Sequence, residues 1–257
     1  MTLPAQWLIL LAACPRTFAL VATAPGFSAA SVPPLVRVTL AVALACTVAP
    51  LVAAPNPALL ALTPQAYVAL LLSELILGGI MGLLLSWLLE AARLAGEVVD
   101  LQIGFRAGAL YDPVGAGSSS VIGQFWFLAA VVLLFALDGH HWLLRGLVRS
   151  VELCPVGTLV FDRSLAAVAL SAVQALFTLA LQTAAPVVAA LILADLTLGL
   201  VGRSMPQMNL MLVGLPGKII VGLAALALSS PLLVRLLTET LALLESHLLA
   251  VLRAVGA

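Results

Sequence analysis

Long apolar stretches separated by short polar or proline-containing connectors dominate this chain. The stretches lie at about residues 4–24, 35–54, 66–89, 121–137, 166–193 and 212–234. No Asp, Glu, Lys or Arg occurs in the intervals 38–73, 113–137 and 164–194. About 20 apolar residues in a helix cross a bilayer core about 30 Å thick, so each interval has room for a spanning segment. The pattern predicts an all-α integral membrane protein.

The last stretch, about residues 235–253, has a different pattern. At roughly 100° per residue, Arg235, Glu239, Ser246 and Arg253 fall within about 40° of one another on a helix. Leucines fill most of the remaining face. This predicts a C-terminal amphipathic helix that lies at the membrane interface or packs on partner helices.

Prolines interrupt several of the apolar stretches. Pro186 lies inside 166–193, and Pro216 and Pro231 lie near the two ends of 212–234. In lipid, the backbone groups freed at a break need neighbouring helices or a cavity. We therefore expect broken helices that are buried in protein. The Lys and Arg residues divide equally between alternate connectors, so the positive-inside rule assigns no orientation.

Composition narrows the functional classes. Hydrophobic residues make up 63% of the 257 residues and charged residues 9%, with a mean hydropathy of +1.23. Soluble domains carry about 25% charged residues. Eleven Lys and Arg balance eleven Asp and Glu, so there is no net charge to attract nucleic acid. A water-soluble enzyme and a nucleic-acid-binding protein both fit poorly.

Two charged residues lie inside apolar stretches, Arg16 in the first and Glu74 in the third. Ionisable groups are costly in hydrocarbon and often functional there. Glu74 precedes Gly78 and Gly82, a small-xxx-small pair that permits close helix approach. Each charge fits either a proton or ion site or a polar clasp between packed helices, and the clasp is the more common case.

The connector after the third stretch is rich in glycine and serine. Charged residues at helical spacing, from Glu90 to Asp100, carry the preceding helix beyond its apolar part. The residues from about 103 to 120 then follow, without a phosphate-binding GK[ST] or GxGxxG motif. They form either a plain solvated loop or a gating loop that carries Phe105, Leu110 and Tyr111.

No catalytic or cofactor site emerges from the motifs. Asp138, His140 and His141 suggest a metal or acid–base site, but adjacent histidines diverge by about 100° on a helix and we find no suitably spaced third ligand. The stretch fits better as an interfacial turn at Gly139. We expect no enzyme activity, no cofactor and no metal.

Four stretches, taken together and in order, resemble one family. They are residues 33–37 (PPLVR), 95–113 (with AGE, GF and YDP), 123–157 (with GQF, LFALDGHH and PVG) and 203–218 (with RSMPQMN and GLPGK). They are similar to the R-type subunit of the flagellar export gate (FliR) and its T-type counterpart in virulence type III secretion (SctT). The turn at 138–140 and residues 214–216 lie closer to the flagellar type.

The resemblance implies a fold, partners and a place for several residues. Members form helical hairpins in an inner-membrane assembly with P-type and Q-type subunits, beside larger export-gate proteins, around a channel for unfolded secretion substrates. The connector after the third stretch is the channel plug. The resemblance therefore leads us to expect the plug at Gly104, Phe105, Arg106, Ala107, Gly108, Leu110, Tyr111, Asp112 and Pro113. Partner contacts are expected at Arg203, Pro206, Asn209 and Lys218.

The sequence thus favours a non-enzymatic export-gate subunit, with residues 1–257 as a single membrane domain in contact with lipid. The alternative is a secondary transporter or permease subunit that uses Glu74 as a coupling carboxylate, since broken helices also occur in transporters. Transporters often contain two related halves, and the polar connector after residue 90 has no match after residue 195.

Overall fold

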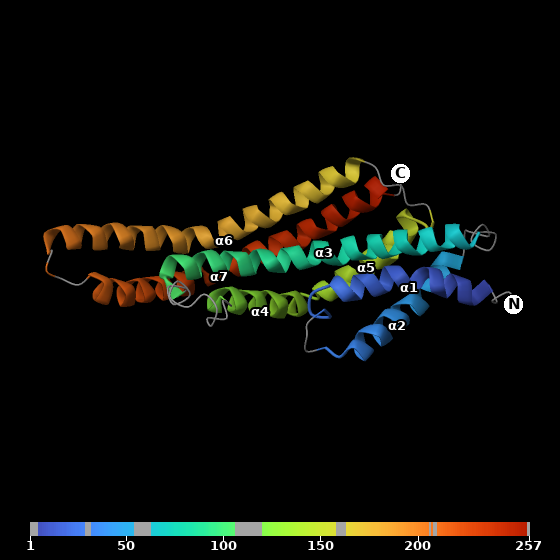
Figure 1. The fold of residues 1–257 in the computed structure, drawn as a ribbon, viewed down its shortest axis with the longest axis horizontal. Helices are drawn as coiled ribbons and strands as arrows, with labels where there is room; N and C mark the ends of the chain where they lie inside the picture. Colours follow the sequence, from blue (N-terminus) through green and yellow to red (C-terminus); the bar gives the residue numbers. More distant parts are fainter. Residues whose placement is uncertain are drawn as a thin grey trace. The chain divides into compact units, whose positions relative to one another are not determined.

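The computed structural model describes residues 5–28, 32–53, 63–105, 120–157, 163–205, 207 and 210–255. Nearly all of this part is helical, and it contains no strand. The helices are α1 (Ala5–Thr23), α2 (Pro34–Ala53), α3 (Pro64–Ile103), α4 (Val121–Ala136), α5 (Gly139–Leu153), α6 (Arg163–Ser204) and α7 (Leu210–Val255) (Figure 1). The prediction of an all-α chain is confirmed.

Several of these helices are long and apolar enough to cross a membrane. Among the described residues the spans are Pro34–Val52, Pro64–Ile103, Ala169–Ser204 and Gly214–Glu239. Only Leu137 and Asp138 separate α4 from α5. If these two helices form one bent span, they are a fifth candidate. The prediction of a membrane protein is confirmed.

The interior prolines do not end the helices that contain them. Helix α6 continues through Pro186, and α7 continues through Pro216 and Pro231 without a boundary near residue 235. A proline removes one N–H from the helical ladder. In apolar surroundings, keeping the other hydrogen bonds costs less than exposing more backbone. The break lies instead after α4, where Asp138 has a φ of 55°.

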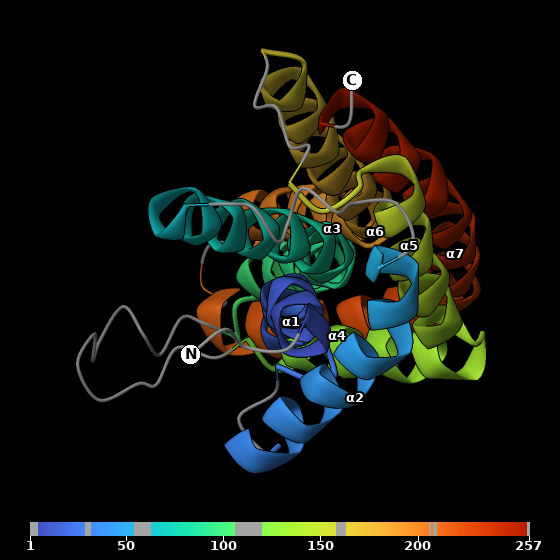
Figure 2. The ribbon, with the colours of Figure 1, turned by 90° about the vertical axis from the view of Figure 1, so that its right-hand side faces the viewer.

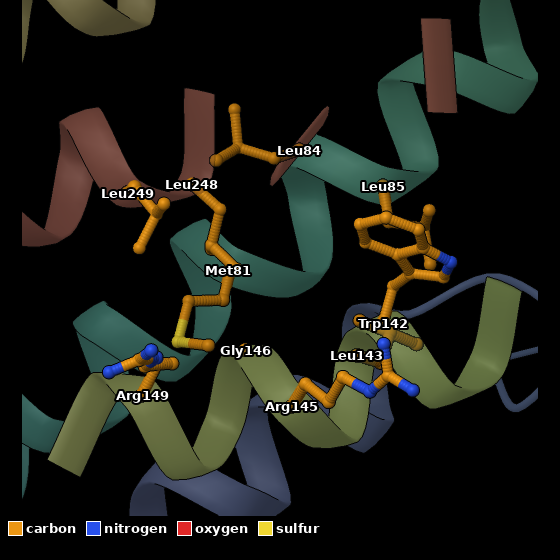
Figure 3. A pocket seen from close by; sticks show the side chains of 10 residues that line it. All are labelled: Met81, Leu84, Leu85, Trp142, Leu143, Arg145, Gly146, Arg149, Leu248 and Leu249. Atoms are coloured by element: carbon orange, nitrogen blue, oxygen red, sulfur yellow. The ribbon is translucent and has the colours of Figure 1, made fainter. Parts of the chain in front are cut away.

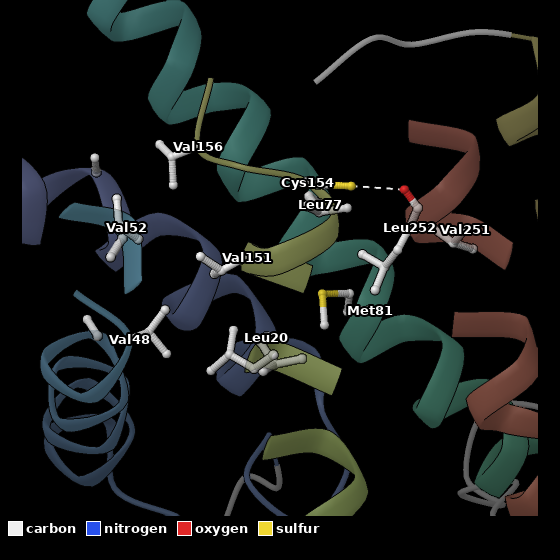
Figure 4. Close-up of a cluster of buried hydrophobic side chains, with 14 of the residues drawn as sticks. Leu20, Val48, Val52, Leu77, Met81, Val151, Cys154, Val156, Val251 and Leu252 are labelled. Atoms are coloured by element: carbon white, nitrogen blue, oxygen red, sulfur yellow. Dashed lines mark hydrogen bonds between the residues drawn. The ribbon is translucent and has the colours of Figure 1, made fainter. Parts of the chain in front are cut away.

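The chain packs as two compact units. The first comprises Met1–Trp87, Leu134–Val173 and Leu241–Ala257, and the second comprises Leu88–Leu133 and Gln174–Thr240. Apolar side chains from α1, α2, α3, α5 and α7 form the core of the first unit (Figure 4). Its labelled members are Leu20, Val48, Val52, Leu77, Met81, Val151, Cys154, Val156, Val251 and Leu252.

Within the first unit, α1 packs against α2 on one side (Figure 2) and against the first half of α3 through small residues. A Cβ atom on Gly78 would lie 2.1 Å from the carbonyl oxygen of Arg16, and one on Gly82 would lie 2.0 Å from Thr23 Oγ1. Larger residues therefore do not fit at this spacing. The two glycines form the close helix contact that the sequence pattern favoured.

The second unit consists of two antiparallel hairpins. In the first, α3 pairs with α4, since Gly96 lies against Gly123 and Arg93 lies 4.3 Å from the ring centre of Phe127. In the second, α6 and α7 run side by side (Figure 1), with Leu191 against Gly222 and Leu198 against Gly214. Helical hairpins were expected from the family resemblance.

Candidate functional site

The two charges inside apolar helices form a buried ion pair. Arg16 Nε on α1 donates a hydrogen bond to Glu74 Oε2 on α3 at 2.6 Å. The two residues are 1% and 0% exposed. Each charge neutralises the other, which removes most of the cost of burying either one alone.

The remaining polar atoms of the pair also have partners. Arg16 Nη1 donates to Ser150 Oγ at 3.0 Å, and Arg16 Nη2 donates to the carbonyl oxygen of Cys154 at 3.0 Å. Glu74 Oε1 accepts from the backbone N–H of Gly157 at 3.3 Å. One network thereby joins α1, α3, the end of α5 and the turn after it.

This geometry favours a clasp over an ion-coupling site. A coupling carboxylate must exchange its partner for a proton or an ion during a cycle. Glu74 is instead held by two donors in a fully buried position, and its guanidinium partner is itself fixed by two further acceptors. A network satisfied in this way gives rigidity rather than exchange.

A second polar site lies where the segment between α3 and α4 ends. Asp100, 0% exposed near the end of α3, accepts hydrogen bonds from the Ser120 hydroxyl and from the backbone N–H of Ile122. Ser120 Oγ in turn accepts from the N–H of Gly123 at 2.7 Å. These acceptors satisfy N–H groups that the first turn of α4 leaves free.

The segment between α3 and α4 begins at Gly104. Gly104 has a φ of 94°, a left-handed conformation that residues with a side chain rarely adopt. Its N–H donates to the carbonyl oxygen of Asp100 at 3.1 Å, and Phe105 beside it is 42% exposed. Asp100 thus contacts both ends of the segment. The other predicted plug residues lie outside the described part of the chain: Arg106, Ala107, Gly108, Leu110, Tyr111, Asp112 and Pro113.

A third polar cluster joins this region to the second hairpin. Asp195 on α6 forms an ion pair with Lys218 on α7 at 2.8 Å and accepts a hydrogen bond from Gln102 Nε2 on α3 at 3.3 Å. Leu215 lies against Gly104. The last turn of α3 is therefore held by both arms of the α6–α7 hairpin.

The residues predicted to contact partners differ in their surroundings. Arg203 is exposed at the end of α6, whereas Lys218 is paired within the chain. Pro206 and Asn209 lie outside the described residues. Contact with a partner stays a prediction for all four.

The turn between α4 and α5 brings three possible ligands together. Asp138 Oδ1 lies 3.4 Å from His141 Nδ1 and 4.0 Å from His140 Nε2. The expectation that no third ligand is near the histidines was therefore wrong, because the left-handed Asp138 turns its carboxylate towards the start of α5. His140 also stacks on Phe135, which fits the expected role as a turn.

Comparison with known proteins identifies the family. Residues 7–244 match the model of a family described as bacterial export proteins, family 1. The chain belongs to this family. The match covers all of the second compact unit and most of the first, and it includes the buried ion pair.

Comparison with individual proteins supports the same family. The chain is 31% identical to the flagellar biosynthetic protein FliR of Caulobacter vibrioides, over 83% of this chain and 85% of that protein. It is 36% identical to FliR of Bacillus subtilis, over 60% of this chain and 61% of that protein. The secretion system apparatus protein SsaT of Salmonella typhimurium is 28% identical over 64% of each chain. The family resemblance predicted from sequence, closer to the flagellar type, is confirmed.

Sequence reasoning missed three residues that organise these sites: Asp100, Ser120 and Asp195. In the sequence, Asp100 is one of several charges at helical spacing, and Asp195 directly follows the uncharged interval 164–194. The available signal was Asp100 at the end of a helix with Ser120 just before the next one, the position of a capping residue.

Proposed function

We propose that this chain is a non-enzymatic subunit of the inner-membrane export gate of a bacterial type III secretion system, of the flagellar kind. The observation that carries the proposal is the family match over residues 7–244. Its relatives are named for flagellar biosynthesis and for a secretion apparatus. The chain would form part of a protein-conducting channel, and the residues from about 103 to 120 would be its plug.

The contacts at the base of this segment support the plug assignment. A plug must be held firmly at its ends while its middle moves. Asp100 bonds Ser120 and the start of α4 at one end and receives the N–H of Gly104 at the other. Next to these hydrogen bonds, close contact between Gly96 and Gly123 holds α3 and α4 together. A chain passing through the channel could displace the middle of the segment without separating α3 from α4.

Residues beside the fixed base would provide closure. Phe105 follows Gly104 directly and exposes 42% of its surface. In this proposal Phe105 and Leu110 make weak apolar contacts with residues of partner subunits, and the glycines on both sides allow the segment to move aside. Weak contacts are required because an unfolded substrate must break them each time it enters.

The proposed partners are P-type and Q-type membrane subunits, the larger export-gate proteins, lipid and unfolded secretion substrates. Large apolar side chains along α6 and α7 support such contacts. Leu193, Leu196, Leu200, Ile220 and Leu228 are each more than 60% exposed. Lipid or neighbouring subunits must cover them.

The assembly can be tested by pulling down a tagged copy from bacterial membranes and measuring the mass of the intact complex. We expect one copy of this chain with several small membrane proteins of other types. A monomer, or a complex that contains only this chain, would refute the export-gate assignment and favour the transporter alternative with Glu74 as coupling group.

A further inference from the structure

A shallow recess with a cavity volume of about 40 Å³ lies between α3, α5 and the end of α7 within the first unit (Figure 3). Its apolar wall comes from Met81, Leu84 and Leu85 on α3 and from Leu248 and Leu249 on α7. Gly146 allows α5 to lie close to α7, since a Cβ atom there would lie 2.4 Å from Leu248 Cδ2. This volume is far below that of pockets that enclose a small molecule, so an occupant would lie along the recess rather than inside it.

Two arginines line the same recess from α5. Arg145 and Arg149 are one helical turn apart, and both are exposed. Arg149 forms an exposed ion pair with Glu152 at 3.1 Å. No ion pair joins Arg145 to another residue of the described part of the chain. Trp142, one turn before Arg145, completes this side (Figure 3).

We propose that this recess binds an anionic phospholipid. Its acyl chain would lie against the leucines and Met81, and its phosphate would meet the guanidinium groups of Arg145 and Arg149. Basic pockets between membrane helices bind lipid head groups in this way. Trp142 has the amphipathic ring that favours the level of the head groups. This site is independent of the proposed export function.

Charge and room favour an anionic phospholipid over three alternatives. Free phosphate would meet only exposed arginines and would leave the apolar wall uncovered. A zwitterionic lipid such as phosphatidylcholine would cover the wall, but the cation of its head group offsets the charge of its phosphate beside Arg145. A helix of a partner would need room beyond a recess that three helices of this unit already surround. An anionic lipid covers the wall and also supplies a net negative charge to Arg145, with the ion-paired Arg149 beside it.

The test is photolabelling of the full chain, purified with its associated subunits and placed in phosphatidylcholine nanodiscs. The probe is a trace of phosphatidylglycerol with a diazirine on one acyl chain. We expect labelled peptides that contain residues 81–85 or 248–249, and displacement by unlabelled phosphatidylglycerol. Phosphatidylcholine and millimolar inorganic phosphate should not displace the probe.

Two variants and one control make the result decisive. Arg145→Gln with Arg149→Gln should reduce labelling about tenfold by removing both charges. Leu248→Trp should fill the recess and abolish labelling by a different route. The control Arg235→Gln removes an exposed, ion-paired arginine of α7 outside the recess and should leave labelling unchanged.

Three results would overturn the proposal. They are labelling of the double arginine variant equal to that of the unchanged chain, equal displacement by phosphatidylcholine, and label that reaches a protein subunit instead of the recess. Protection of the buried Cys154 thiol from alkylation verifies that each variant is folded.

Discussion

Replacing Arg16 by methionine tests the buried clasp most sharply. Methionine is unbranched and apolar and reaches about as far as Nε of arginine, so it fills the space of the aliphatic part without a charge. The change leaves Glu74 Oε2 buried without its partner at 2.6 Å, and it removes the donors to Ser150 Oγ and the Cys154 carbonyl. Gly157 remains the single donor to the carboxylate within the network.

The expected cost follows from this loss. Removing one member of a buried ion pair destabilises a protein by about 3–5 kcal/mol. Replacing both charges, as in Arg16→Met with Glu74→Leu, leaves no buried charge. The Cys154 carbonyl lacks its donor in both variants, at a cost of about 1–3 kcal/mol in each. The double variant also removes the acceptor of the Gly157 N–H, but Gly157 is exposed, so this loss costs less than a buried charge. The double variant should therefore be more stable than Arg16→Met alone.

Cysteine alkylation provides the assay. The Cys154 thiol is buried and donates to the carbonyl oxygen of Leu252 (Figure 4), so it reacts only when this unit opens. With Cys14 and Cys46 replaced by alanine, the maleimide reaction rate reports opening of the first unit. A tenfold change in an equilibrium corresponds to about 1.4 kcal/mol. Arg16→Met should raise the rate by about a hundredfold to a few thousandfold.

The control is Arg235→Met, which breaks an exposed ion pair with Glu239. Exposed pairs contribute about 0–1 kcal/mol, so the rate should change by less than about fivefold. The reasoning fails if Arg16→Met reacts as slowly as the unchanged chain. It also fails if the double variant opens more readily than the single one.

Further predictions concern the close helix contacts and the base of the proposed plug. Gly78→Ala should lower the melting temperature of the purified chain, because its Cβ would lie 2.1 Å from a backbone oxygen, whereas Gly79→Ala, with nothing within 4 Å, should not. Equal melting temperatures would contradict this. Gly96→Ala should separate α3 from α4 and reduce the yield of intact complex in a pull-down, and an unchanged yield would argue against a tight contact. Asp100→Ala should speed amide hydrogen exchange at Ile122 about tenfold, since the Ser120 hydroxyl and the Ile122 N–H lose their acceptor; unchanged exchange there would refute the anchoring role.

Local pattern was enough to predict some of these features. Gly78 and Gly82 are one turn apart on an apolar helix, so their role in close packing follows from spacing alone. Arg16 and Glu74 each stood out because a charge in an apolar stretch needs a partner. Their mutual pairing did not follow, since 58 residues separate them and nothing local specifies that α1 lies along α3.

Other features depended on tertiary context. Pro186, Pro216 and Pro231 suggested breaks, but an apolar environment favours keeping the helix around them. The cluster of Asp195, Lys218 and Gln102 forms only because α6 folds back on α7 beside the end of α3. The spacing of these residues in the sequence does not predict that they meet.

The measurement that tests the central claim most directly is the ion conductance of membranes that contain the assembled complex, with and without a deletion of residues 106–110. The deletion leaves Asp100, Gly104 and Ser120 in place, so the complex should keep its mass in the pull-down. We predict that conductance to small ions rises, and that Phe105→Ala gives a smaller rise. An intact complex with unchanged conductance after the deletion would contradict the assignment of this segment as the plug.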